Sequence, residues 1–562
     1  MKFTRHWIRT AVLNRLKAER KYLKGLRLGA LTNTFNSFVK GLAFSAAGVS
    51  LLSLPAQATE ITPHGTHTKV SQNGNTYTIT TDQIKGINAF NAFQKFTLDS
   101  NNIANLQFPT NTSNLLNFVY DKINIQGTVN AIKNNKIGGN LYFLSSQGLI
   151  LGKGGVINAG AFFAMTPNKD FMNKFKISSG LNTDLSTEIG WITDKKFVNR
   201  DGVTYKKGII MAPDGQITIE GSINTLNGIG IYSGGQLYDE SSKQYKGAIS
   251  IGSQASLNSL SDFSNVVNLN GIEAPDSLEL KSDEGNIELV SIGDNSHATN
   301  WMLTYIAGFA DSQALFTKEQ RKNAVGKAEV NIAKGAKVNS RKDLNVEAIT
   351  TNGQLATTYT ESRSHSYNAA SSFAELHSDV KIGGELTAAG NINIKAVSDS
   401  NFVTSSFNVF NIGMTLLGAT TPFNFAAYPV MTDIYSNVDI AKGSKITAGN
   451  KVNVKADTYS VVNAGVSTSS ISTKAALHSA GNYIPSIATI YVDNNTGATV
   501  NVAGELVSKG TSESNSSISV DAVSENRISA SATAANKNNN NPSKKILKEI
   551  AEAEEAKNSG HM

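Results

Sequence analysis

Apolar and polar residues alternate in short runs along most of this chain, and Gly or Asn separates the runs. One such pattern occurs four times in the second half, beginning at Val330, Val380, Val438 and Val500. In each case an alternating run is followed by a turn and by a second alternating run. A period of two places every second side chain on one face, so each run is predicted to be a β-strand with one buried face.

Short strands of this kind cannot bury a face alone, but successive coils of them can stack around one apolar column. The repeats, which start 50, 58 and 62 residues apart, therefore predict an all-β chain built as a right-handed parallel β-helix. Alternating runs at 216–223 and 277–289 extend the pattern toward the amino terminus. An array of β-sandwiches is the alternative, but the paired hairpin-turn residues that it needs, such as Asn73-Gly74, do not recur at each repeat.

Ser- and Ala-rich apolar stretches lie between the repeats, at 357–376, 401–435 and 458–492. We expect them to form additional strands of the same stack, with contact to a host membrane as the alternative. Residues 301–316 are different, because the aromatic and aliphatic side chains there follow an approximately helical spacing. This spacing predicts a short helix that packs on the β-helix, using Trp301, Tyr305, Ile306, Phe309 and Phe316.

The carboxy-terminal residues 536–562 begin with an Asn-rich linker. Ser543 is then predicted to cap a helix over residues 544–557. Its apolar residues Ile546, Leu547 and Ile550 either cover the last coil of the stack or belong to a solvated tail.

The amino terminus is patterned as an export signal. Residues 1–40 are basic, an uncharged and mostly apolar run extends from Gly41 to Leu54, and Ala56-Gln57-Ala58 forms an A-x-A site. Fourteen residues at ~1.5 Å each are too short to cross a hydrocarbon core of ~30 Å as a helix. We therefore predict an extended signal peptide at 1–58 that is cleaved after Ala58, with a basic amphipathic helix on a membrane surface as the alternative.

The formal net charge of +7 is concentrated in this leader. Ten of the 51 Lys and Arg residues and one of the 44 acidic residues lie in 1–58, which leaves 41 basic and 43 acidic residues elsewhere. The remainder, near −2, lacks the basic excess of a nucleic-acid-binding domain, so we predict no nucleic-acid partner. The sequence has no Cys, which excludes disulfides, thiol chemistry and zinc–thiolate sites and suits a chain that crosses a periplasm unfolded.

Few residues suggest chemistry. His64 and His67 are close enough in sequence to share a metal, but no His-Glu-x-x-His motif surrounds them, and neither a nucleophile elbow nor a phosphate-binding loop occurs. Corresponding polar positions of the four repeats hold a mixture of residues, not the paired carboxylates of a glycoside-cleaving site; they are Asn331, Lys381, Asp439 and Asn501. We predict no catalytic residue, no metal and no cofactor, and a β-helical polysaccharide-degrading enzyme is the weakest alternative.

Residues 60–170 contain a distinctive order of short elements. Asn-x-Phe-x-x-Phe at 91–96 is followed by Gly-x-Val at 127–129, Gly-Leu-Ile-Leu-Gly at 148–152 and Ile-Asn-x-Gly at 157–160. In these elements the chain resembles the amino-terminal secretion domain of two-partner secretion exoproteins, the filamentous-haemagglutinin-like family, and among them leukotoxin-type filamentous adhesins. Ser145-Ser146-Gln147-Gly148 stands where the family has Asn-Pro-Asn-Gly, so the Gly is kept and the Asn-Pro turn is absent.

The resemblance implies a secretion domain at 59–170 and a repetitive β-helix at 171–535. It also implies export from a Gram-negative cell through a partner outer-membrane transporter, and a secreted or surface-exposed adhesin that binds an unidentified receptor on host or neighbouring cells. A cytolysin of the leukotoxin type is the alternative. The residues that the resemblance assigns to transporter recognition are Asn91, Phe93, Phe96, Gly127, Gly148, Gly152 and Asn158.

Overall fold

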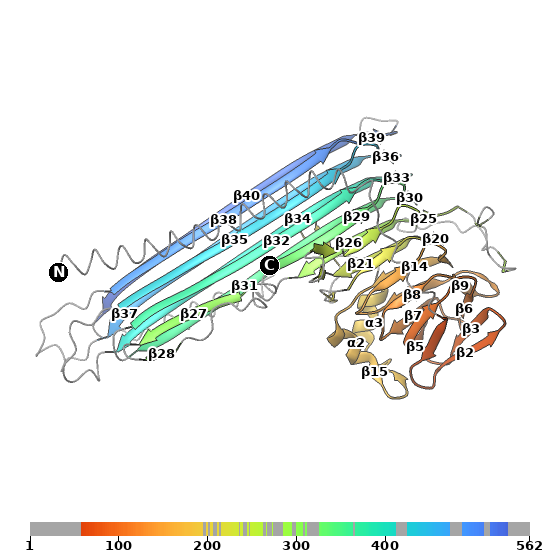
Figure 1. Cartoon of the computed structure of the whole chain (residues 1–562), viewed down its shortest axis with the longest axis horizontal. Coiled ribbons are helices and arrows are strands. Elements are labelled where there is room, and N and C mark those ends of the chain that lie inside the picture. Colours follow the sequence, from red (N-terminus) through yellow and green to blue (C-terminus); the bar gives the residue numbers. More distant parts are fainter. Residues whose placement is uncertain are drawn as a thin grey trace, which may run out of the picture. The chain divides into compact units, whose positions relative to one another are not determined.

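The computed structural model describes the chain from Ala58 to Lys537, with gaps (Figure 1). The predicted signal peptide, apart from Ala58, and the predicted helix at 544–557 lie outside the described residues. The described residues are 58–194, 198–200, 203–205, 209, 211–212, 215–234, 237–239, 244–246, 248–261, 263, 266, 272–273, 285–294, 299–306, 309–311, 325–362, 366–411, 424–471, 486–510 and 517–537.

Three parallel ladders of strands run through the described chain, and each complete coil adds one strand to each ladder. The first ladder contains β5 (Asn88–Leu98), β7 (Asn114–Val119), β11 (Asn140–Leu144), β14 (Ala161–Met165), β21 (Ile229–Gly234), β26 (Ile287–Asp294), β31 (Leu344–Ser362), β34 (Ile392–Asn411), β37 (Val452–Ile471) and β40 (Ile518–Lys537).

The second ladder starts at the carboxy end of β5 and continues through β8 (Ile123–Ile125), β12 (Leu149–Leu151), β19 (Ile217–Ile219), β24 (Ile249–Ile251), β29 (Val325–Ile332), β32 (Ser366–Ile382), β35 (Asn424–Ile440) and β38 (Ser486–Val502). The third contains β3 (Thr76–Thr81), β6 (Ile103–Gln107), β9 (Thr128–Lys133), β13 (Val156–Ala159), β20 (Ser222–Thr225), β25 (Ser256–Ser259), β30 (Lys337–Ser340), β33 (Glu385–Ala388), β36 (Lys445–Ala448) and β39 (Glu505–Ser508). These pairings confirm the parallel β-helix and exclude the sandwich array.

The apolar positions of the repeats form the core, as the alternating pattern predicted. Val330, Val380 and Val438 occupy successive places of the second ladder in register, and each is fully buried. The same column continues in the amino-terminal direction through Ile249, Ile217, Leu149 and Ile123, all at most 2% exposed. One continuous apolar cluster therefore extends from Ile79 to Ala456.

A ladder of asparagines runs along the third ladder. Each side-chain amide donates to the side-chain oxygen of the asparagine one coil earlier, at 2.9–3.2 Å, through Asn105, Asn130, Asn158, Asn224, Asn258 and Asn339. Asn130 and Asn158 are fully buried. A buried amide is stable only when its polar atoms are hydrogen-bonded, so each member depends on the coil below and the coil above.

From β31 onward the strands of the first two ladders lengthen to 17–20 residues. Their outer parts form two layers, which we call the arm: β31, β34, β37 and β40 lie in one layer, and β32, β35 and β38 in the other (Figure 1). Val430, Val462, Ala464 and Val466 form an apolar cluster of their own between the layers. The stretches at 357–376, 401–435 and 458–492 are thus strands of the same stack wherever they are described, as predicted.

A belt of buried hydroxyls separates the interior of the arm from the core of the coils. Thr350 donates to Ser398 at 2.9 Å, and Ser398 donates to Ser378 at 3.1 Å. One coil later Thr458 donates to Ser436 at 3.0 Å. All five residues are at most 1% exposed. Hydroxyls can donate and accept at once, so they satisfy one another where the two layers leave the coil.

The helix predicted at 301–316 is wrong wherever the structure describes these residues. Residues Thr299–Ile306 form strand β27, which pairs antiparallel with β32 over eight residues and with β28 (Phe309–Asp311). Phe316 lies outside the described residues. The extra length of β32 provides a partner strand that the local spacing of aromatic residues does not reveal.

The remaining elements decorate the coils or their ends. Most are two- or three-residue strands in antiparallel hairpins, and two are helices. They are β1 (Glu60–Pro63), β2 (Thr68–Asn73), β4 (Ile84–Lys85), β10 (Lys136–Ile137), α2 (Lys169–Phe175), β15 (Lys176–Ile177), β16 (Gly180–Leu181), α3 (Ser186–Thr193), β17 (Val198–Arg200), β18 (Val203–Tyr205), β22 (Leu237–Asp239) and β23 (Gln244–Lys246).

The asparagine ladder makes its buried members important for stability. We expect Asn158→Ala to lower the free energy of unfolding by roughly 1–3 kcal/mol, because the change leaves the facing polar atoms of Asn130 and Asn224 without their buried partner. Urea unfolding followed by circular dichroism measures the change. Asn339→Ala, at the exposed end of the same ladder, should have a much smaller effect; equal effects would contradict this explanation.

Candidate functional site

The first coil is covered by strands that precede it in the sequence. β1 pairs antiparallel with β5 from Glu60 opposite Thr97 to Pro63 opposite Phe93, and β4 pairs antiparallel with another part of β5. β2 pairs antiparallel with β3 over six residues. Since β3 and β5 belong to the first coil, β1, β2 and β4 protect edges that would otherwise be open. We call these strands and the residues that join them the cap (residues 60–75 and 82–85).

A segment from the loop between β14 and β19 covers the outside of the first ladder. It contains α2, β15, β16 and α3, and the Asn168 side chain caps α2 by accepting from the Phe171 amide at 2.8 Å. The apolar side of α2 and α3 packs on outward-facing residues of β5, β7, β11 and β14 in a second core cluster, which includes Phe90, Phe118, Tyr142 and Phe163. The outer face of these coils is apolar and needs this cover.

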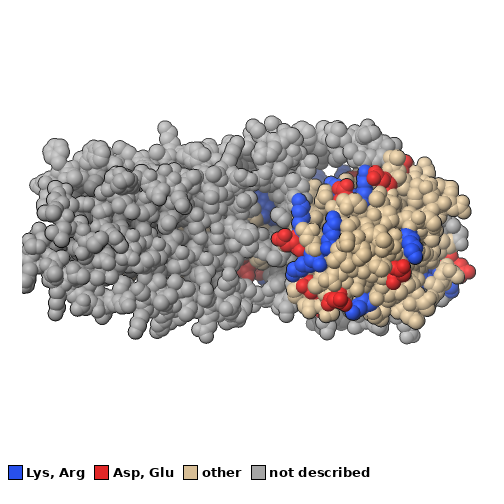
Figure 2. Space-filling model, turned by 90° about the horizontal axis from the view of Figure 1, so that it is seen from below, with Lys and Arg blue, Asp and Glu red and all other residues tan. Residues whose placement is uncertain are grey.

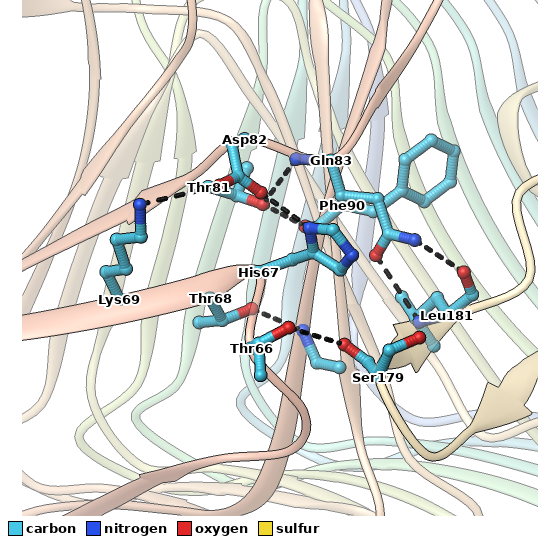
Figure 3. A network of polar contacts seen from close by, with 11 residues as sticks. Thr66, His67, Thr68, Lys69, Thr81, Asp82, Gln83, Phe90, Ser179 and Leu181 are labelled. Carbon is cyan, nitrogen blue, oxygen red and sulfur yellow. Dashed lines mark hydrogen bonds and ion pairs between the residues drawn. The ribbon is translucent and has the colours of Figure 1, made fainter.

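The same segment holds the cap through hydrogen bonds between residues about 100 positions apart (Figure 3). The Gln83 side chain donates to the Leu181 carbonyl at 2.5 Å and accepts from the Leu181 amide at 3.3 Å. The Thr66 amide donates to the Ser179 carbonyl at 3.0 Å. We call this contact between the cap and residues 176–184 the clamp.

Electrostatic contacts add to the clamp and to the cap. Lys85 lies 3.0 Å from Asp184 across the clamp. Within the cap, Asp82 lies 2.6 Å from His67 Nδ1 and 3.4 Å from Lys69 (Figure 3). The hydrogen bond to His67, with a smaller contribution from Lys69, holds the pKa of Asp82 below its ordinary value, although burial acts in the opposite direction. Asp82 is 56% exposed, so these contacts contribute little to the stability of the folded chain. That contribution is present above the pKa that Asp82 has in the unfolded chain. It is lost as the pH falls through the lower pKa of the folded chain.

The two predicted recognition phenylalanines lie inside the first coil. Phe93 and Phe96 are fully buried and meet edge to face with ring centroids 5.2 Å apart. Phe96 makes the same kind of contact with Phe143, also at 5.2 Å. The spacing of three residues therefore joins two aromatic anchors of the core.

The two predicted asparagines are also buried and hydrogen-bonded. The Asn91 side chain donates to Asn117 at 2.9 Å, and Asn117 in turn donates to the Tyr142 carbonyl at 2.9 Å. Within the described part of the chain, Asn91 Oδ1 accepts no hydrogen bond. Asn158 is a member of the asparagine ladder.

The three predicted glycines lie at close approaches between coils. Gly148 has φ of +94°, and a Cβ there would overlap the Gln216 carbonyl oxygen. At Gly127 a Cβ would overlap the Asn102 carbonyl oxygen, and at Gly152 it would overlap the Gln126 side chain. At Gly127 and Gly148 only a residue without a side chain fits, because the backbones of adjacent coils come this close. At Gly152 the neighbour is the end of a side chain.

The seven predicted residues therefore do not gather on a folded surface; they shape the interior and the turns of the first coils. Sequence reasoning missed the clamp, although one signal was available. Asn168, which follows Pro167, precedes buried apolar residues at Phe171, Met172 and Phe175, which is the pattern of a capped amphipathic helix. Of the predicted cleavage-site residues, Ala56 lies outside the described residues and Ala58 is exposed.

Outward positions of the second ladder form a polar surface farther along the stack. The structure brings Asn331, Lys381, Asp439 and Asn501 into register, as the repeats predicted. On the same surface His377 lies 2.8 Å from Glu375 and stacks on Tyr435, with ring centroids 5.5 Å apart. Tyr435 is 38% exposed.

A hollow lies between α3 and the first ladder, lined by residues that include Tyr142, Phe163, Asp194, Tyr232 and Glu288. The Tyr232 hydroxyl donates to Glu288 at 2.5 Å. Burial, together with the charge of Glu288, raises the pKa of Tyr232 well above its ordinary value. The phenol therefore stays neutral and remains a donor at physiological pH.

The described residues were compared with the features that metal ions, membranes and nucleic acids require. No group of three or more His, Asp or Glu side chains that could hold a metal ion occurs among the described residues. No helix in the described ranges is long and apolar enough to cross a membrane. Figure 2 shows basic and acidic side chains interspersed on the described part of the visible face, which is not the basic stripe that nucleic acids require.

The clamp can be tested with two glycines of the cap that share a positive φ. Gly65 has φ of +79° and a Cβ there would overlap the Ser179 carbonyl, whereas Gly74 has φ of +58° with open space around it. We expect Gly65→Ala to open the clamp, so that amides of residues 176–184 exchange hydrogen faster in mass spectrometry of the full chain. Gly74→Ala carries only the backbone strain of ~1–2 kcal/mol and should leave that exchange unchanged; faster exchange in both variants would show that strain alone loosens the cap.

Among known proteins, similarity to this chain is found with solved structures. No family model matches the sequence, and no curated protein matches it. Among solved structures, the chain matches the crystal structure of the HMW1 secretion domain from Haemophilus influenzae with 13% identity and a TM-score of 0.24, over 80% of this chain and 99% of that one. The assignment of the β-helix above rests on the strand pairings of this chain alone.

Proposed function

We propose that this chain is an exoprotein that a partner outer-membrane transporter exports from a Gram-negative cell, and that it acts outside the cell as an adhesin. The proposal of export is supported by the order in which the cap and the coils follow one another along the sequence. The cap comes first in the sequence and covers the first coil, and each later coil then pairs with its predecessor. A stack of this kind can form from its amino-terminal end while the rest of the chain is still in transit.

The clamp sets the length of the first unit in this order. The cap strands are complete at residue 85. Their hydrogen bonds to Ser179 and Leu181 can form only after about 100 further residues have emerged. We propose that the unit that starts folding outside the cell extends through the clamp, to about residue 194, and not only to residue 170. Coils beyond it need no contact with the cap to continue the stack.

The burial of the motif residues suggests when the transporter would read them. Asn91, Phe93 and Phe96 are at 0% exposure in the folded chain. A transporter that recognises them must therefore bind the chain before the first coil closes. An extended segment that still has its backbone groups free can pair with an exposed strand edge of a partner.

The adhesin assignment is supported by the outward surface of the second ladder. Tyr435 is an exposed aromatic ring fixed by its stack on His377, and Glu375 provides hydrogen-bonding atoms beside it. Exposed aromatic residues on a rigid sheet are favourable contact points for a partner because little side-chain freedom is lost on binding. The long, regular strands would present this surface away from the first coils.

Export is the first test. We expect the full chain to reach the outside of the cell only when its candidate transporter is coexpressed, as measured by immunoblotting of medium and intact cells. Asn91→Ala should reduce this export at least about tenfold if the transporter reads the motif, since recognition depends on a few anchoring contacts. Asn258→Ala removes a member of the asparagine ladder that contacts none of the predicted recognition residues and should leave export nearly unchanged.

Two results would contradict the proposal on secretion. Export that does not depend on the transporter would exclude two-partner secretion. Equal losses for Asn91→Ala and Asn258→Ala would show that stability, and not recognition, limits export.

Attachment to host cells tests the adhesin assignment. We expect purified Tyr435→Ala protein to bind cells at least about threefold less than the unchanged chain, because an interface loses ~1 kcal/mol or more with an anchoring aromatic ring. Tyr459→Ala is the matched control, since Tyr459 is a partly exposed ring on the outward side of the first ladder and not on this surface. Lysis of the cells without stable attachment would favour the cytolysin alternative.

A further inference from the structure

The outer side of the first ladder carries two apolar rows in its first four strands. β5, β7, β11 and β14 each contribute one residue to each row, in register. None of these residues is more than 9% exposed in the folded chain. We call them the outer face; one row contains Phe90, Leu116, Tyr142 and Phe163, and the other contains Ala92, Phe118, Leu144 and Met165. A folded protein seldom leaves an apolar surface of this kind open to water.

Residues 168–194, which we call the strap, cover the outer face. The strap contains α2, β15, β16 and α3, and its apolar residues belong to the same core cluster as the outer face. The ring centroids of Phe175 and Phe118 lie 4.7 Å apart, and those of Phe171 and Phe175 lie 5.5 Å apart. Phe175 is fully buried. The low exposure of the outer face therefore depends on the strap.

The strap follows the outer face in the sequence. Every residue of the outer face precedes Pro167, and the buried strap residues begin at Phe171 and end at Ile192. An extended chain advances ~3.3–3.6 Å per residue, so about 13 residues span the roughly 40–45 Å of a membrane with its headgroups. When β14 has just emerged from a transporter, Phe171 and Phe175 are therefore still inside it. The outer face is complete outside the cell before the strap can cover it.

The strap shows which chemistry the outer face accepts. Its buried residues at this contact are aromatic or aliphatic; they are Phe171, Met172, Phe175, Leu181, Ile189 and Ile192. A surface that holds the outer face before the strap arrives must offer side chains of the same kind. The outer mouth of the transporter is the surface nearest to the outer face at that stage, because the chain that follows β14 is still in the pore.

We propose that an apolar surface at the outer mouth of the transporter holds the outer face until the strap displaces it, so that closure of the strap releases the first unit. This inference rests on the proposed secretion through a partner transporter. The clamp makes closure difficult to reverse, because its hydrogen bonds form only when the strap is in place. His64 Nε2 donates to the Ile177 carbonyl at 2.9 Å, and the Gln83 side chain donates to the Leu181 carbonyl.

A charge at the centre of the strap tests the release step. Phe175→Asp places a carboxylate against buried Phe118, so the strap should stay open. The full-length variant is coexpressed with the transporter, and intact cells are treated with a crosslinker. We expect the variant to reach the cell surface and the fraction crosslinked to the transporter to rise at least about tenfold, because an apolar contact strong enough to hold the chain persists. An added peptide with the sequence of residues 168–194 should lower that fraction again.

Phe263→Asp is the matched control. Phe263 is 1% exposed and packs with Ile137 and Leu226 in a separate apolar cluster. The same change there leaves the strap and the outer face intact, so its crosslinked fraction should equal that of the unchanged chain. Circular dichroism of the purified variants shows whether the coils form.

Gln83→Ala is a milder second variant if Phe175→Asp does not fold. It removes the Gln83 hydrogen bonds of the clamp and keeps the apolar residues of the strap, so closure becomes easier to reverse. The crosslinked fraction should then rise about twofold or more, as expected for the loss of a buried hydrogen bond.

Several results would overturn the proposal. Equal crosslinking of Phe175→Asp and Phe263→Asp would show that lower stability, and not the open strap, keeps the chain on the transporter. Chains held at the surface by lipid or by other copies, without a crosslink to the transporter, would show that the outer face has a different occupant. A peptide without effect would show that the outer face is not the surface held. Retention of both strap variants inside the cell would place the action of the strap before export.

Failure of this inference differs from failure of the proposed function. If the unchanged chain leaves the cell without the transporter, both are wrong. If export needs the transporter and Phe175→Asp is crosslinked no more than the unchanged chain, only the release step is wrong.

Discussion

Parallel pairing of each strand with the same position one coil earlier is the constraint on which the rest of the structure depends. It places like residues over like residues, as with Val330, Val380 and Val438 in the core and with the asparagines of the third ladder. In these columns an inward valine is covered by another aliphatic side chain, and a buried amide finds an amide partner. The same constraint fixes the register, because a shift of one residue would turn the apolar side of every strand outward.

This mode of stacking leaves an edge at the first coil, and the chain covers it. At the amino-terminal end the antiparallel strands of the cap pair with β3 and β5, and the clamp secures them through backbone groups of Ser179 and Leu181. The covered first coil can form first and template the coils that follow.

The sequence predicted those parts of the fold that a period of two determines. The four repeats, their register and the polar positions from Asn331 to Asn501 are as expected, because alternation specifies both the strand and its buried face. The prediction failed at β27, whose conformation depends on pairing with distant β32 and not on local spacing. The helix α2 that leads into the clamp had a signal in its Asn168 cap, but the contacts of the clamp could not be predicted, since they use carbonyl and amide groups of Ser179 and Leu181.

The motif residues explain why the predicted recognition site is not a surface of the folded chain. Phe93, Phe96 and Gly148 meet strict requirements of packing and backbone conformation, and those requirements alone would preserve them. A role in recognition would also require that the transporter bind these residues early, because a side chain at 0% exposure is accessible only before its coil closes. If a transporter reads these residues, closure of the first coil also ends recognition. Folding outside the cell would then release the chain from its partner and make its passage irreversible.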